Sequence, residues 1–170
     1  MRKKGIAIAC AALAVVLIGT AVYLQKRKNT IRPDAVKVIN VMMTCPDEKY
    51  YSPKTVTILG EGAPPETAEQ KKERKALAKQ IEANWKKAVG DCFENDDRFE
   101  KFFSSPAAMW YHAQEKKVRV KSMELTDSNA KNGTQTVKVT AAVDGQETVV
   151  SILFTYGENG KIRYVTVQSD

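Results

Sequence analysis

His112 and two aspartates, Asp96 and Asp97, are the residues of this sequence best suited to acid–base chemistry. A carboxylate that binds an imidazole can help it act as a general base, provided that the fold brings the two groups within hydrogen-bonding distance. The sequence contains one histidine, which excludes a site built from two or more of them. Because it follows Trp110 and Tyr111, we expect His112 to be a partly exposed helix residue rather than a catalytic base.

Acidic residues form a second cluster that could hold a hard cation. Such ions prefer several oxygen ligands, but the spacing of these side chains fits no cation-binding loop. Helix capping accounts for one of the two aspartates at 96 and 97. We therefore expect neither a metal site nor a cofactor. The cluster comprises Asp91, Glu94, Asp96 and Asp97.

Aromatic side chains are the remaining candidates for a binding site. Such residues more often form a core than a ligand cage, and we expect a core here. The alternative is a small-molecule site in an apolar opening, formed by Trp110, Tyr111 and His112. The whole aromatic set comprises Tyr50, Tyr51, Phe99, Phe102, Phe103, Trp110 and Tyr111.

Residues 5–25 contain no charged side chain and lie between two basic clusters, residues 2–4 and 26–28. At about 1.5 Å per residue, a helix of this length spans roughly 30 Å, the thickness of the bilayer's hydrocarbon core. The pattern predicts a single membrane anchor whose residues 5–25 contact lipid, with its basic flanks at the headgroups.

Two other interpretations of this segment stay open. A cleaved signal peptide usually has an apolar core of about 7 to 15 residues, and the best cleavage pattern here, Gly19-Thr20-Ala21, is followed by more apolar sequence. Cys10 suggests lipidation, but little apolar chain precedes it. The basic flanks are balanced, so orientation rests on the short N-terminal tail, from which we expect an extracytoplasmic C-terminal domain.

The net charge of +7 is concentrated at the anchor. Six of the 27 basic residues flank it, which leaves 21 basic and 20 acidic residues from residue 29 onward. A nucleic-acid-binding domain should show a concentrated basic face, so we expect no nucleic acid partner. The basic residues around Lys71, Lys75 and Lys79 alternate with glutamates, which predicts a solvated helix face.

Residues 29–32 form a short linker, and residues 33–170 suffice for one domain that begins with helices. The first is predicted over residues 33–45, ended by Pro46. A second begins at Thr67, with Gln70 completing a capping box, and ends at Gly90. Asn95 or Asp96 caps a shorter helix, and a further turn follows Ser105. The long helix has the apolar stripe Leu77, Ile81, Trp85, Ala88 and Cys92.

Cys45 and Cys92 each lie at the end of an apolar helical stripe. An exported domain permits disulfides, and a bridge between these two would stabilise the fold by roughly 4 kcal/mol in the chain-entropy model. Two buried free thiols are the alternative, since the sequence does not give the distance between the α-carbons.

From Lys117 the apolar period becomes two, which predicts a four-stranded antiparallel meander. Its phase slips between Val120 and Met123, as a bulge would cause. Asp144-Gly145 and Asn159-Gly160 mark turns, and residues 149–154, apolar on both faces, predict a central strand. Helices followed by a meander indicate an α+β domain with helices packed on a curved sheet.

This order of elements resembles the NTF2-like, or cystatin-like, superfamily, and the plan of a short N-terminus, one span and an exported domain resembles VirB8-like subunits of secretion channels. The resemblance covers residues 33–170 and rests on element order. Such a resemblance leaves the function open, because this fold hosts enzymes, ligand carriers and assembly modules alike. We expect a non-enzymatic interaction or scaffold domain of a cell-envelope assembly, with envelope protein partners or further copies of itself. The alternative is a small-molecule sensor or carrier.

Overall fold

The computed structural model describes residues 30–55 and 66–168. The chain divides into two compact units, residues 1–30 and 31–170, and the elements below belong to the second. The predicted anchor at 5–25 lies outside the described residues. Within the described ranges, no helix combines the length and apolarity that a membrane crossing requires.

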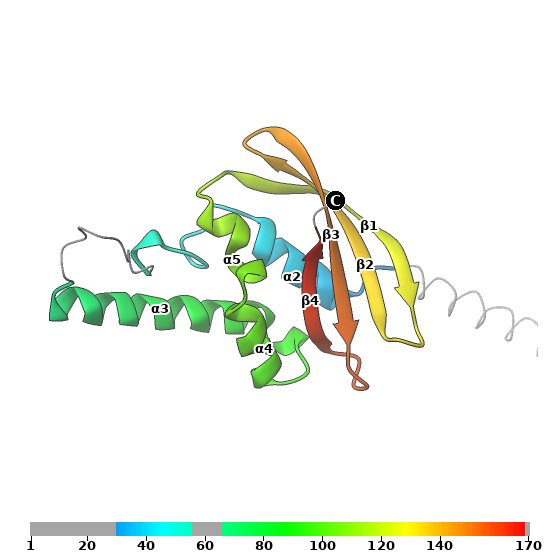
Figure 1. Ribbon diagram of the computed structural model, residues 1–170, viewed down its shortest axis with the longest axis horizontal. Coiled ribbons are helices and arrows are strands. Elements are labelled where there is room, and N and C mark those ends of the chain that lie inside the picture. The colour runs from blue at the N-terminus through cyan, green and yellow to red at the C-terminus, as the bar shows by residue number, and fades with distance from the viewer. Residues whose placement is uncertain (1–29, 56–65, 169–170) are drawn as a thin grey trace, which may run out of the picture. The chain divides into compact units, whose positions relative to one another are not determined.

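The second unit is an α+β domain in which helices precede a sheet, as the sequence predicts (Figure 1). Its described helices are α2 (Pro33–Met43), α3 (Ala68–Val89), α4 (Asp96–Phe103) and α5 (Pro106–Ala113), with short 3-10 turns η1 (Pro53–Thr55) and η2 (Gly90–Cys92). The strands are β1 (Val118–Asn129), β2 (Thr134–Val143), β3 (Gln146–Tyr156) and β4 (Ile162–Gln168).

α2 begins at Pro33, whose fixed φ suits the first helical turn. It ends at Met43, earlier than predicted. The reason is that Cys45 leaves the helix to pair with β1, exchanging backbone hydrogen bonds of 3.2 and 2.9 Å with Val118.

α3 begins with the predicted capping box. The Thr67 side chain accepts from the backbone N–H of Gln70 at 3.2 Å, and the Gln70 side chain accepts from the Thr67 N–H at 2.9 Å. The helix ends before Gly90, as expected, but Gly90 is right-handed, with φ −57°, and continues into η2.

The two shorter helices settle two open points. Asn95, rather than Asp96, caps α4, because its side chain accepts from the Arg98 N–H at 3.0 Å. The turn predicted after Ser105 is a helix, α5, that starts at Pro106.

The four strands form an open antiparallel sheet in the order β1-β2-β3-β4. The predicted bulge is confirmed between Val120 and Ser122, and a second follows between Leu125 and Asp127. The predicted β2–β3 turn is also confirmed, since Asp144 and Gly145 have φ values of 50° and 86°. This left-handed pair matches the twist of a two-residue hairpin.

β3 lies inside the sheet, as predicted, but the expectation that both its faces are buried is wrong. Val150, Ile152, Phe154 and Tyr156 are buried, whereas Val149 on the other face is 36% exposed. The helices pack on one face of the sheet, so only the alternate side chains that point to that face are buried.

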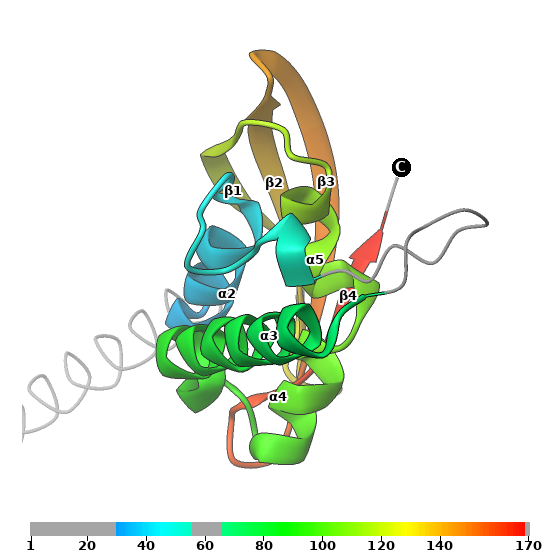
Figure 2. The ribbon, with the colours of Figure 1, turned by 90° about the vertical axis from the view of Figure 1, so that its left-hand side faces the viewer.

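The core lies between the helices and the buried face of the sheet. Figure 2 shows the long strands β2 and β3 curving beside α2 and α5, with α3 crossing near them. Trp85 of α3, Phe99 of α4 and Phe154 of β3 are the largest side chains that are fully buried there. α5 packs against the helices α2 and α4 and against the strand β4.

Candidate functional site

The three consecutive residues predicted as a ligand site, Trp110, Tyr111 and His112, do not form one surface. Consecutive side chains on a helix point about 100° apart. Because α5 packs against α2, α4 and β4, these three side chains meet different surroundings. Trp110 is 58% exposed, Tyr111 is buried and His112 is 2% exposed. The structure brings Trp110 and Tyr111 to one groove and places His112 in the core.

His112 is buried, so the expectation of a partly exposed helix residue is wrong. Its Nε2 lies 2.8 Å from the carbonyl oxygen of Val41, while Nδ1 is buried with no hydrogen-bond partner. The rings of Tyr50, Tyr51 and Trp85 surround it. Burial lowers the pKa of His112, so the neutral imidazole is favoured.

The carboxylates considered for a dyad with His112 are bound elsewhere. Asp96 forms an ion pair with Lys86 at 2.7 Å, and Asp97 forms one with Lys101 at 2.9 Å. Both aspartates are exposed, whereas His112 is enclosed by aromatic rings. The structure thus does not assemble the acid–base pair.

The other acidic residues of the cluster are also paired with cations. Asp91 lies 3.4 Å from Lys37. Glu94 accepts two hydrogen bonds of 2.9 Å from Arg163, and these lower the pKa of Glu94. Over residues 30–55 and 66–168, no three acidic, histidine or cysteine side chains are grouped to hold a metal ion.

Cys45 and Cys92 are free thiols in this structure, and both are buried. Their nearest polar partners differ: the Cys45 Sγ lies 3.6 Å from the Met42 carbonyl oxygen, and the Cys92 Sγ lies 3.6 Å from Asp91 Oδ1. Burial raises the pKa of each thiol to about 12. At neutral pH both are therefore protonated and poorly nucleophilic.

An apolar groove of about 810 Å³ lies between α5 and the strands β3 and β4. Trp110 and Tyr111 line its helical side, and Val149 and Val165 lie on its sheet side. Among the residues that the structure describes, Lys116 is the one charged residue that lines this groove. The sequence predicted Trp110 and Tyr111 as residues of a binding site. It did not predict the strand residues, because they lie far from these two in the sequence.

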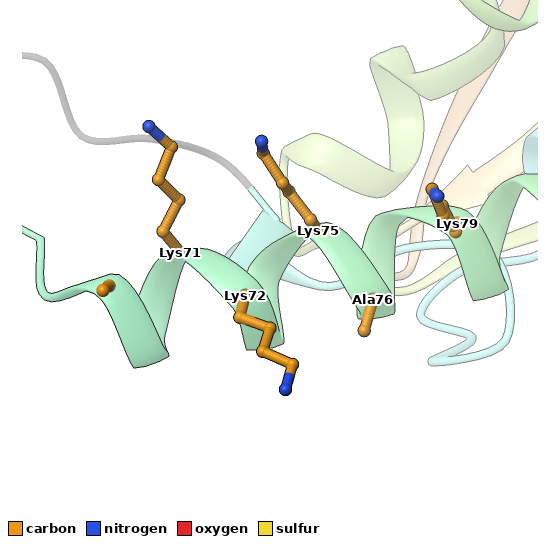
Figure 3. A pocket seen from close by; sticks show the side chains of 6 residues that line it. Lys71, Lys72, Lys75, Ala76 and Lys79 are labelled. Carbon is orange, nitrogen blue, oxygen red and sulfur yellow. The ribbon is translucent and has the colours of Figure 1, made fainter.

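The N-terminal half of α3 carries a second surface, which we call the lysine face. Its lining residues are Ala68, Lys71, Lys72, Lys75, Ala76 and Lys79. Figure 3 shows Lys71 and Lys75 projecting from one edge of this face and Lys72 from the other. The glutamates that alternate with these lysines in the sequence, Glu69 and Glu73, do not line it.

The four lysines of this face form no ion pair with any residue that the structure describes. Arg74, in contrast, holds Glu66 through two bonds of 2.9 and 3.2 Å. The sequence predicted a solvated, mixed-charge helix face. Lys71, Lys75 and Lys79 are spaced four residues apart, and Lys72 lies three residues before Lys75. This spacing places them on one side of a helix, and it is the signal in the sequence that could have predicted the lysine face.

Comparisons with family models, with curated proteins and with solved structures find no match to this chain. Its function is therefore inferred from its residues and their geometry.

Proposed function

We propose that this protein is a membrane-anchored interaction domain, and that the lysine face of α3 binds an acidic surface on its protein partner. It works on the extracytoplasmic side as a subunit or accessory factor of a cell-envelope assembly. The observation that carries this proposal is the lysine face itself: four ammonium groups on one side of a helix, without ion-pair partners among the described residues.

The N-terminal half of α3 contributes little to the core. The buried residues of the helix begin at Ile81 and continue with Trp85 and Val89, whereas the preceding turns are largely exposed. In Figure 1 this half extends beyond α2 and α5. A helix half that is capped and largely exposed is suited to contact another protein.

Charge determines the kind of partner. Complementary surface charge speeds encounter and selects among partners, so the lysine face favours a surface rich in aspartate and glutamate. A symmetric dimer would place the same face against itself and bring like charges together. A second copy of this chain in a symmetric dimer would therefore bind through another surface.

The fold proposal is an NTF2-like domain, with the VirB8-like plan as its finer form. It is supported by the order of helices before a four-stranded antiparallel sheet and by the bulged first strand. Residues 29–32 would hold such a domain close to the bilayer, because a linker of this length has little reach.

A small-molecule sensor or carrier is the second candidate function, and the groove beside α5 favours it. Its volume of about 810 Å³ lies within the range of about 300 to 1,000 Å³ that is typical of ligand sites. A bound apolar compound that copurifies with the full chain and quenches Trp110 fluorescence would favour this candidate over the assembly role.

The proposal is tested by photocrosslinking in native membranes. A photoreactive residue replaces Lys75 on the lysine face or Lys138, which is exposed on β2. We expect Lys75 to capture one partner with an acidic surface and Lys138 to capture none. The protein should resist carbonate extraction, and its domain should be digested by protease outside spheroplasts.

Three results would each contradict part of this proposal. Equal capture from both positions would show that α3 is not the docking element. A soluble mature protein would contradict the membrane anchor. A domain protected from protease would contradict the extracytoplasmic orientation.

A further inference from the structure

β3 is longer than the strand beside it, and this leaves one of its edges open. The pairing of β3 with β4 stops at Ser151 opposite Gln168. From Gln146 to Val150, β3 still pairs with β2 on its other side, where Val150 lies opposite Val139. Over residues 146–150, the edge that faces away from β2 has no partner strand within the described part of the chain. Open strand edges present unpaired backbone donors and acceptors.

The apolar groove runs along this open edge. Thr148, Val149 and Val150 line it from β3. From the helix side, Pro106, Trp110, Tyr111 and Gln114 line the groove. They are spaced as neighbours on one side of α5. An open strand edge beside a helix, with apolar side chains lining the groove between them, is an arrangement in which an extended peptide can add a strand.

Lys116 marks one end of the groove. The next residue, Lys117, is tied to the β2–β3 turn, because its backbone N–H donates to Asp144 Oδ1 at 2.8 Å and its carbonyl accepts from the Asp144 N–H at 2.8 Å. Lys116 therefore lies near the turn end of the groove. Its ammonium group has no ion-pair partner in the described ranges.

The direction of β4 determines which end of a bound strand would meet Lys116. β4 is antiparallel to β3 and runs from Ile162 toward the level of Ser151. A strand that continues this course beside residues 146–150 would run toward the β2–β3 turn. Its carboxyl end would then arrive at Lys116.

We propose that this groove binds the C-terminal segment of another protein as an added strand. The segment is extended and about five residues long, which at about 3.3 Å per residue spans roughly 17 Å. Its side chains alternate between apolar and small polar, and its terminal carboxylate pairs with Lys116. This site uses α5 and β3, so it stands independently of the lysine face on α3.

The probe is a soluble peptide of alternating valine and serine residues, labelled at its N-terminus, with either a free or an amidated C-terminus. Binding to the full chain in detergent micelles is measured by fluorescence polarisation. We expect the free acid to bind about tenfold more tightly than the amide, since a charge-assisted hydrogen bond is lost. Lys116→Gln should abolish this preference, and Lys131→Gln, a change to an exposed lysine in the β1–β2 turn, should preserve it.

Amide hydrogen exchange separates strand addition from ordinary apolar binding. Bound peptide should slow exchange within residues 146–150, because their backbone groups gain partners, whereas a small molecule would leave those amides unchanged. Trp110→Ala should weaken binding without unfolding the domain, since Trp110 is 58% exposed.

The proposal fails if neither peptide binds, if acid and amide bind equally, or if binding brings no protection to β3. Residues that follow Gln168 could compete with the peptide for the same edge of β3. The proposal therefore also fails if the peptide binds only to a chain that has been shortened to end at Gln168. None of these results bears on the lysine face, which a separate crosslinking experiment tests.

Discussion

His112 of α5 donates a hydrogen bond from its Nε2 to the carbonyl oxygen of Val41 in α2, over 2.8 Å. A carbonyl can only accept, so the proton of the neutral ring lies on Nε2 and Nδ1 is unprotonated. Nδ1 is buried without a partner. Protonation would add a buried charge at this position, which is costly.

This pairing predicts a pH dependence of stability. Burial lowers the pKa of His112 below its ordinary value of 6.5, so its contribution to stability is present above pH 6.5 and is lost as pH falls through the folded pKa. The thermal midpoint of the wild type should fall more steeply below pH 6.5 than that of His112→Gln, which cannot titrate. Parallel curves for the two proteins would contradict this account.

Trp85 is the central side chain of the core. It is fully buried, and its Nε1 donates to the Tyr50 carbonyl oxygen at 2.8 Å. Trp85→Phe should cost about 1–3 kcal/mol of unfolding free energy, since it leaves that carbonyl unpaired. Trp85→Ala should cost about 3–5 kcal/mol, because it also leaves a cavity.

Urea unfolding measures both changes, with Trp110→Phe as the control. Trp110 is 58% exposed, so its replacement should alter the unfolding free energy by no more than about 0.5 kcal/mol. If Trp85→Phe were as mild as this control, the hydrogen bond to Tyr50 would not stabilise the fold.

The sequence predicted best those features that depend on neighbours in the chain. The capping box at Thr67 and Gln70 and the bulge after Val120 each leave a local mark, and both are present. The burial of His112 leaves no such mark. It results from packing against Val41, seventy-one residues away, and a short helix with apolar residues on several sides does not show which one faces the core.

The thiols provide a further test. If Cys45 and Cys92 are free and buried, as in this structure, neither should react quickly with a thiol reagent in the folded protein at neutral pH, where a pKa of about 12 leaves little thiolate. Unfolding without reductant should expose both to labelling. Mass spectrometry counts the labels, with a Cys10→Ser chain to exclude the third cysteine.

A disulfide would give the opposite result. The unfolded, unreduced protein would then show neither thiol, and reduction would lower the thermal midpoint by several degrees, as the loss of roughly 2–4 kcal/mol implies.

The candidate sites were only partly predictable for the same physical reason. Trp110 and Tyr111 were identified as groove residues, but Val149 and Val165 join them only through the sheet register. The lysines of α3 were recognised, yet their separation from Glu73 becomes evident only once they are placed on the helix. The nearly equal numbers of basic and acidic residues gave no sign of this uneven distribution, because composition does not show where charged residues lie on a helix.

The most direct test of the central proposal is charge reversal on the lysine face. Lys72→Glu with Lys79→Glu changes two residues that lie off the buried stripe of Ile81 and Trp85. The control, Lys131→Glu with Lys138→Glu, makes the same charge change at exposed positions outside that face. Both variants should unfold at nearly the wild-type temperature, since exposed substitutions seldom alter stability.

Recovery of the crosslinked partner from native membranes is then measured for both variants. We predict that the α3 variant loses about tenfold or more of its partner, because like charges now oppose each other at the interface, and that the control keeps it. If the folded α3 variant recovers its partner as well as the control does, the lysine face is not the docking surface.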